Sequence, residues 1–247
     1  MIDMHCHLDL YPNALDILER TNQDNIFTLA VTTSPRAWLA TTEVFKNYSN
    51  IYVSLGMHPE IIESKSNEID LLMGNIKKTN FIGEVGIDGS SRYSKTFALQ
   101  KEVFENVLKE SEKQKGKIIS IHSRKAVKTV LDSIEKYPRC GKAVLHWFSG
   151  TQKELERAIS LDCWFSVNPK MLKSKKGLSL IKKIPKNRLF PETDGPFVSI
   201  DNNFLYPWDA ISISNELAFL WECYENEVLL QMKQNLKKLI ENLGDSQ

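Results

Sequence analysis

Residues 1–10, MIDMHCHLDL, form an apolar run that carries two histidines one residue apart. Side chains alternate along a β-strand, so His5 and His7 would point to one face of this strand and Cys6 to the other. Two imidazoles on one face can share a metal ion, whereas Cys6 would pack against the outer helices as a small apolar residue. The stretch therefore predicts a buried first strand that carries a metal site.

Seven more short runs rich in Val, Ile and Phe follow residues 1–7. They are IFTLAVTT (26–33), IYVSLGMHP (51–59), FIGEVGID (81–88), KIISIHSR (117–124), AVLHWFSG (143–150), CWFSVNP (163–169) and RLFPETDGP (188–196). Amphipathic stretches at helical spacing lie between them, at 35–47, 94–115, 125–137, 151–161 and 171–184. Strands that alternate with helices form parallel sheets. Eight such units predict an α/β fold, the (β/α)8 TIM barrel, with a doubly wound open sheet as the alternative.

The repeating pattern loosens toward the C-terminus. Residues 195–211 would form a long loop, and we expect a distorted or shortened unit near 163–211. Two helices, near 212–223 and 225–243, would close the chain. The sequence contains no linker or low-complexity tract, so residues 1–247 are expected to form a single domain.

The composition is that of an ordinary globular protein. Hydrophobic residues make up 42% and charged residues 26% of the chain, and the net charge of +1 gives no overall field that attracts nucleic acid or membrane. The chain has no apolar run near the roughly 18 residues of a membrane span. Its four cysteines are scattered, without a CxxC pair. We therefore expect a cytoplasmic protein with reduced thiols and no membrane partner.

One stretch, KMLKSKKGLSLIKKIPKNR (170–188), is strongly basic. It would form either a solvated helix face or a patch that steers phosphate groups toward a neighbouring site. The second alternative matters only if the stretch lies beside the functional site.

The histidines and two carboxylates fall at equivalent places in the repeat. Glu84 lies inside an apolar strand, where a charge is costly unless it is paired or bound to metal, and Asp194 ends the last strand. All five histidines lie near the C-terminal ends of predicted strands, which is the end of a barrel that carries the active site: His5, His7, His58, His122 and His146.

These residues predict a metal centre. Six candidate ligands exceed the three or four of a single catalytic zinc, and they suit two divalent ions that share one carboxylate: His5, His7, Glu84, His122, His146 and Asp194. Imidazole and carboxylate ligands suit zinc, manganese or iron, and a two-metal site could also use magnesium.

Six segments together resemble the TatD family of metal-dependent deoxyribonucleases, within the wider group of metallo-dependent hydrolase barrels. They are DMHCHLD (3–9), GMHP (56–59), IGEVGID (82–88), IHSRKA (121–126), LHWFSG (145–150) and ETDGP (192–196), in the order typical of the family. The length and the divergent C-terminal loop are most similar to the TatD-like component of Qat antiphage-defence operons.

The resemblance implies a role for each matching residue. One metal ion would be held by His5, His7, Glu84 and Asp194. Glu84 would bridge to a second ion, held also by His122 and His146. Asp194 would act as the general base on the attacking water, so the implied catalytic residues are Asp194 and Glu84.

Three more residues receive roles around the metals. His58 would contact the substrate phosphate, unless it is a hydrogen-bonded residue of the site wall. Arg124 would pair either with a phosphate or with a neighbouring acid. Asp88 would orient a metal ligand.

The chain departs from the family pattern in the loops that contact substrate. The stretch NNFLYPWDA (202–210) replaces the usual Arg-Asn-Glu-Pro, HWF (146–148) replaces HCF, and RKA (124–126) replaces RDA. Tyr206, Trp208 and Trp147 would either stack on bases or pack in the protein.

The implied function is hydrolysis of DNA phosphodiester bonds by water that a two-metal centre activates, with single-stranded DNA or 3′ ends as the partner. Hydrolysis of an amide, a lactone or an aminoacyl ester on the same centre is an alternative. A non-catalytic role beside other proteins of a defence operon is another.

Overall fold

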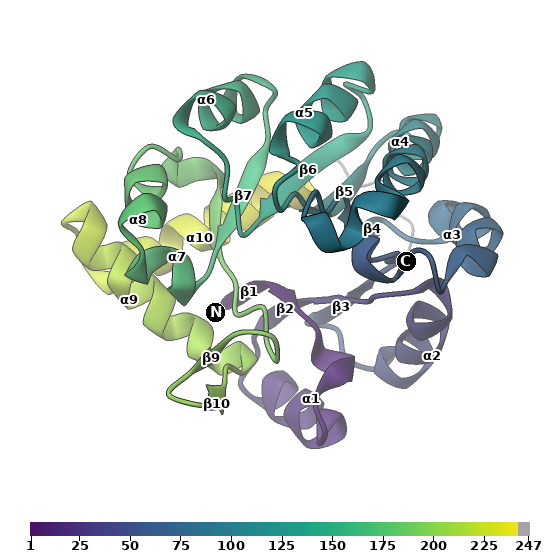
Figure 1. Cartoon of the computed structure of the whole chain (residues 1–247). Helices are drawn as coiled ribbons and strands as arrows, with labels where there is room; N and C mark the ends of the chain where they lie inside the picture. The colour runs from purple at the N-terminus through teal and green to yellow at the C-terminus, as the bar shows by residue number, and fades with distance from the viewer. Residues whose placement is uncertain (242–247) are drawn as a thin grey trace.

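Eight parallel strands form the central ring of the computed structural model, which describes residues 1–241 (Figure 1). The strands are β1 (Ile2–Cys6), β2 (Phe27–Val31), β3 (Ile51–Ser54), β4 (Phe81–Gly86), β5 (Lys117–His122), β6 (Gly141–His146), β7 (Trp164–Val167) and β8 (Leu189–Pro191). Each of the eight apolar runs therefore coincides with one strand, as predicted, although β6 begins two residues before its run.

Helices surround the ring on its outer side (Figure 1). They are α1 (Ala14–Gln23), α2 (Pro35–Phe45), α3 (Ile69–Asn75), α4 (Phe97–Lys113), α5 (Val127–Lys136), α6 (Gln152–Ser160), α7 (Pro169–Lys173), α8 (Lys175–Ile181), α9 (Ala210–Trp221) and α10 (Glu225–Ile240). The predicted last helix, 225–243, ends at Ile240, and positions 242–243 lie outside the described residues.

The ring is closed, which confirms the TIM barrel and rules out the open doubly wound sheet. Strands β1 to β3 pair in order, as do β4 to β8. A bridge between Leu55 and Ile82 joins β3 to β4. On the other side, the Asp194 N–H donates to His5 O at 2.9 Å and the His7 N–H donates to Gly195 O at 2.8 Å. Backbone hydrogen bonds thus connect the first strand to the segment after the last.

The strands are buried on both faces, as parallel strands under a helical layer must be. All residues of β1, β4 and β5 are buried. Cys6 lies in a cluster with Ile17 and Leu18 of α1, which confirms that it packs outward, away from the two histidines.

The unit near 163–211 is shortened, as expected. Strand β7 has four residues and β8 has three. The loop after β8 contains a small antiparallel pair, β9 (Ser199–Ile200) and β10 (Asn203–Phe204). The predicted helix over 171–184 is two helices, because Ser174 adopts an extended conformation and its side chain caps α8 by accepting from the Gly177 N–H at 2.9 Å.

The last two helices cover the barrel beside β8. Asn235 of α10 donates from Nδ2 to the carbonyl oxygens of Lys186 and Leu189, each at 2.9 Å. Across residues 1–241, no helix is both long and apolar enough to cross a membrane.

Candidate metal centre

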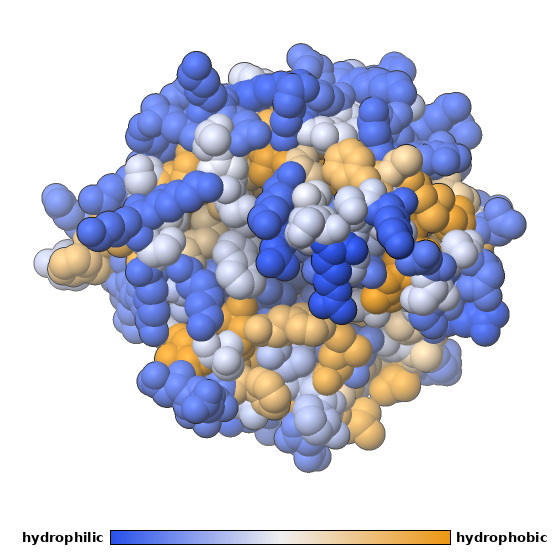
Figure 2. All heavy atoms as spheres, in the orientation of Figure 1, coloured by the Kyte–Doolittle hydropathy of each residue, from blue (hydrophilic) through white to orange (hydrophobic). Residues whose placement is uncertain are grey.

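The six predicted metal ligands meet at the C-terminal end of the strands, where a barrel carries its active site. All six side chains are buried. Five of them line a cavity of about 490 Å³, and His5 lies fully buried beside them. Figure 2 shows that this face of the molecule is hollowed at its centre.

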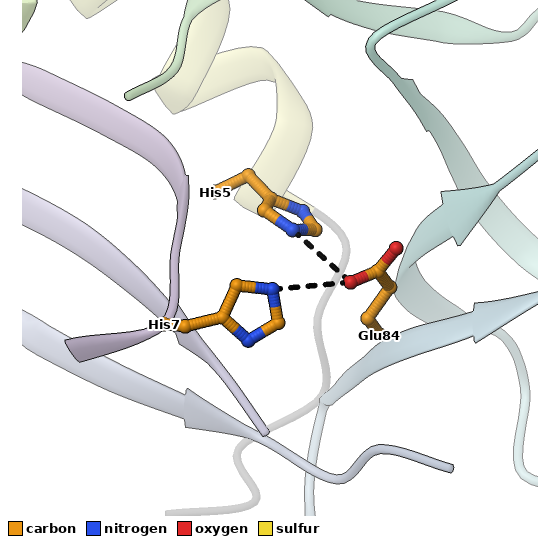
Figure 3. A group of neighbouring side chains, drawn as sticks. All are labelled: His5, His7 and Glu84. Carbon is orange, nitrogen blue, oxygen red and sulfur yellow. Dashed lines mark ion pairs between the residues drawn. The ribbon is translucent and has the colours of Figure 1, made fainter. Parts of the chain in front are cut away.

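Glu84 divides the ligands into two groups, one around each carboxylate oxygen. Oε2 lies 3.4 Å from His5 Nε2 and 3.2 Å from His7 Nε2 (Figure 3). Asp194 Oδ1 completes this group, at 3.7 Å from His5 Nε2 and 3.8 Å from His7 Nε2. The ligand atoms of His5, His7 and Glu84 lie close enough together to hold one ion, and Asp194 lies beside them.

The other oxygen of Glu84 faces a second group of imidazoles. Oε1 lies 2.7 Å from His122 Nδ1, 3.4 Å from His146 Nε2 and 3.3 Å from His58 Nε2. A single buried carboxylate thus has a different set of nitrogens on each of its two oxygens.

Hydrogen bonds orient three of these imidazoles. His146 Nδ1 lies 3.3 Å from both carboxylate oxygens of Glu192, and His122 Nε2 lies 2.9 Å from Asp88 Oδ2. His5 Nδ1 lies 2.8 Å from the hydroxyl of Ser120. A partner on one ring nitrogen fixes the ring and leaves the other nitrogen for a metal. Asp88 thus lies where a residue that orients a ligand should lie.

A backbone hydrogen bond determines which ring nitrogen of His58 carries the proton. Its Nδ1 accepts a hydrogen bond from the Glu60 N–H at 3.2 Å. The neutral ring must then carry its proton on Nε2, which points toward Glu84. In this tautomer His58 presents a hydrogen-bond donor to the cavity that it lines, although its position beside Glu84 and His122 would also suit a metal ligand.

Burial and neighbouring charges set the protonation of the candidate ligands. Burial and the nearby His146 lower the pKa of His5 to about 4, so the ring is neutral, and its buried Nε2 makes no hydrogen bond. Burial alone would raise the pKa of Glu84, but the surrounding histidines hold it well below the usual range. Burial raises the pKa of Asp194, and the nearby Glu192 and Glu84 add to this effect.

Burial alone would lower the pKa of His122, but hydrogen bonds to Asp88 and Glu84 raise it to about 9. Burial alone would also lower the pKa of His146, but Glu192 and Glu84 raise it well above its usual range. Both imidazoles must lose a proton to bind a metal ion, so metal binding at this site would release protons.

Sequence analysis missed Glu192 and Asp3. Glu192 is fully buried and accepts hydrogen bonds from Asn168 Nδ2 at 3.0 Å and the Trp147 N–H at 3.1 Å, in addition to its contact with His146. Asp3 accepts from the N–H and hydroxyl of Thr193, at 2.9 and 2.6 Å, and so ties β1 to the residue before Asp194. Both are acidic residues in apolar runs, the signal that identified Glu84.

Arg124 lies at the edge of the cavity, which it helps to line. Its side chain is 61% exposed and its Nη1 lies 3.8 Å from Glu60 Oε1. The guanidinium therefore has a neighbouring acid, held loosely, and remains accessible to a phosphate.

The three aromatic residues for which stacking or packing was predicted lie in two different environments. Tyr206 stacks between Tyr11 and Trp208, with centroids 5.4 and 4.8 Å away, and the guanidinium of Arg20 covers Trp208 at 3.7 Å. The structure thus favours the packing alternative for Tyr206 and Trp208. Trp147, by contrast, lines the cavity.

The first part of the basic stretch 170–188, in α7 and at the start of α8, lies next to the site. Helix α7 begins directly after β7, and the ammonium of Lys176 in α8 donates to the carbonyl oxygen of Ser149 at 2.5 Å. Ser149 lines the cavity. This part of the stretch is therefore close enough to act on a charged substrate.

Comparisons with known proteins agree with this fold and with a metal-dependent hydrolase. The model of the family described as TatD related DNase matches residues 2–241. An uncharacterized metal-dependent hydrolase from Buchnera aphidicola is 33% identical over 81% of this chain and 82% of its own length. The human deoxyribonuclease TATDN3 is 26% identical over 98% of this chain and 95% of its own. The crystal structure of YjjV, a TatD homologue from Escherichia coli K12, superposes with a TM-score of 0.86 over 97% of both chains at 22% identity, a likeness of fold.

Proposed function

Because the chain belongs to the TatD family of metal-dependent hydrolases, we propose that it is a deoxyribonuclease that cleaves DNA phosphodiester bonds at a two-metal centre. The observation that carries this proposal is the position of Glu84, whose two carboxylate oxygens face two separate groups of imidazoles. A carboxylate placed in this way bridges two ions in two-metal sites.

Each ion would have its own ligands. His5, His7, Glu84 and Asp194 would hold one, and Glu84, His122 and His146 would hold the other. When bound, the ions would lower the pKa of water and stabilise negative charge on the phosphate. The ligand types are compatible with zinc, manganese or magnesium.

The other site residues would act on water and substrate. Asp194, buried beside the other ligands, would accept the proton of the attacking water on a carboxylate oxygen. His58 would donate its Nε2 proton to a phosphate oxygen, because Nδ1 is already engaged as an acceptor. Arg124 would form an ion pair with the same phosphate or with the next one.

DNA as the substrate is supported by the human relative, which is named a deoxyribonuclease. We further propose that the substrate is single-stranded DNA or a 3′ end. The protein would act in the cytoplasm and have a role in a Qat-type defence operon. The four free cysteines support a reducing compartment.

The test is cleavage of labelled oligonucleotides by purified protein loaded with zinc, manganese or magnesium. Single-stranded, blunt duplex and 3′-overhang substrates should be compared with bis-p-nitrophenyl phosphate. We expect metal-dependent cleavage of DNA that Glu84→Gln abolishes. Cleavage of an amide, a lactone or an aminoacyl ester but of no phosphodiester would replace the proposal with the second hydrolase function. Inactivity toward all of these would favour the non-catalytic role.

A further inference from the structure

Two aromatic side chains line the cavity, one beside each half of the metal centre. Trp147 follows β6, and its ring meets the imidazole of His146 edge-on, with centroids 6.4 Å apart. Phe197 lies in the loop after β8, and its ring meets the imidazole of His7 edge-on at 4.8 Å. Among the described residues that line the cavity, no other side chain is aromatic apart from the histidines.

Phe197 is not explained by packing, and Trp147, although it packs partly against the core, is held in an unfavourable backbone conformation. Phe197 is 63% exposed, although phenyl groups are ordinarily buried. Trp147 has a backbone φ of 41°, a left-handed conformation that is costly for a bulky residue. The Trp147 N–H donates to Glu192, the same buried carboxylate that orients His146. The chain thus fixes an indole at the site in spite of backbone strain.

The two aromatic residues of the loop after β10, Tyr206 and Trp208, are engaged in packing, and the exposed Phe204 lies outside the cavity lining. Tyr206 is covered on both sides by Tyr11 and Trp208, and the outer face of Trp208 is covered by Arg20. Trp147 and Phe197 are therefore the rings that an incoming molecule can meet at the cavity.

A phosphodiester at the centre carries one nucleoside on each side. Aromatic side chains bind bases without regard to sequence, because every base has a π face. Among the described residues that line the cavity, Arg124 is the one Lys or Arg side chain, so the protein offers few ion pairs to the phosphates around the scissile bond. Resting on the proposed nuclease function, we propose that Trp147 and Phe197 stack on the two nucleobases that flank the scissile phosphate. The substrate must then present bases that are not stacked in a duplex.

The experiment compares a labelled single-stranded oligonucleotide with the same oligonucleotide carrying tetrahydrofuran abasic residues on both sides of the scissile phosphate. Trp147→Ala and Phe197→Ala should each lower kcat/KM on the first substrate by about 5- to 150-fold, the factor expected for stacking of one base. On the abasic substrate, the kcat/KM of each variant should nearly equal the kcat/KM of the wild type on that same substrate. Phe219→Ala is the matched control, because Phe219 is 88% exposed on α9 and lies outside the cavity lining.

Two outcomes of the kinetic experiment would overturn the proposal. Equal losses on both substrates would show that the rings support the metal centre, and unchanged kinetics on both would show that they do not contact bases. If the wild type cleaves neither oligonucleotide, the nuclease function fails, and fluorescence anisotropy of the same two oligonucleotides decides about stacking. Stacking would be supported if the two variants bind the base-containing oligonucleotide more weakly than the wild type does and bind the abasic oligonucleotide equally well. Equal binding by all variants, or no binding by the wild type, would overturn it.

Discussion

Glu84 lies between the two groups of imidazoles, so both metal ions should depend on its negative charge. We predict that Glu84→Gln lowers the occupancy of both ions, because a neutral amide is a weak bridging ligand. Asp194→Asn should keep most of the metal, since His5, His7 and Glu84 remain. Its activity should fall about 10²- to 10⁴-fold, which is the usual contribution of a general base to the rate. Elemental analysis of dialysed protein and an activity assay test this pair. A single ion at saturating metal, or full activity in either variant, would contradict it.

Glu192 acts on the metal through His146. We predict that Glu192→Gln lowers metal affinity about 10- to 100-fold, the effect expected when the carboxylate partner of a ligating histidine is removed. Titration of metal-free protein with zinc measures this change. Asp88→Asn provides the comparison, because Asp88 contacts His122 in the same way. Unchanged affinity in Glu192→Gln would mean that the ring of His146 is held by packing alone.

At the scale of elements, Glu68 links two helices through a buried carboxylate. It is 2% exposed and accepts a hydrogen bond from the Arg36 N–H in the first turn of α2 at 3.0 Å. Burial alone would raise its pKa, but this hydrogen bond and the nearby Lys65 and Arg36 lower it. A carboxylate at a helix N-terminus also interacts favourably with the helix dipole.

We predict that Glu68→Gln lowers the free energy of unfolding by about 1 kcal/mol at pH 7. Because the folded pKa lies below the unfolded one, near 4.3, the ionised carboxylate stabilises the fold above that pH. This contribution is lost as the pH falls through the folded pKa. Urea unfolding of both proteins between pH 3 and 7 should show the difference shrinking toward low pH. A constant difference across this range would show that the charge is not responsible.

The strands were predictable because buried parallel strands are continuous apolar runs, and each run of this sequence coincides with one strand. The break between α7 and α8 was not, since the amphipathic period continues across Ser174 and only the backbone conformation of that residue separates the two helices. The role of Glu192 could not be read either. Its partners Ser166, Asn168 and Trp147 come from other segments of the chain and meet it only in the folded barrel.

The metal centre belongs to the molecule as a whole. His5 and Asp194 come from opposite ends of the barrel sequence, and the backbone hydrogen bond between them also closes the ring. Their types and strand positions could be predicted from the repeat, but the distances between them depend on closure. The net charge of the whole molecule, in contrast, contributes little to substrate binding. The 32 basic and 31 acidic residues nearly cancel, so only local groups of charged side chains can act on a substrate.

The lysines of α7 and α8 are such a group, at the end of the barrel where the cavity lies. Lys173 and Lys176 are exposed, so we predict that the double variant Lys173→Gln, Lys176→Gln binds single-stranded DNA more weakly. Each lost phosphate contact should reduce the slope of log K against log salt by about 0.7. Fluorescence anisotropy of a labelled oligonucleotide at several salt concentrations measures this slope. The matched control is Lys77→Gln, Lys78→Gln, which removes two exposed charges at the opposite end of the barrel, before β4. Because both double variants change the net charge equally, a smaller slope only in the first would assign the contacts to α7 and α8. Equal slopes in all three proteins would show that these lysines form a solvated face.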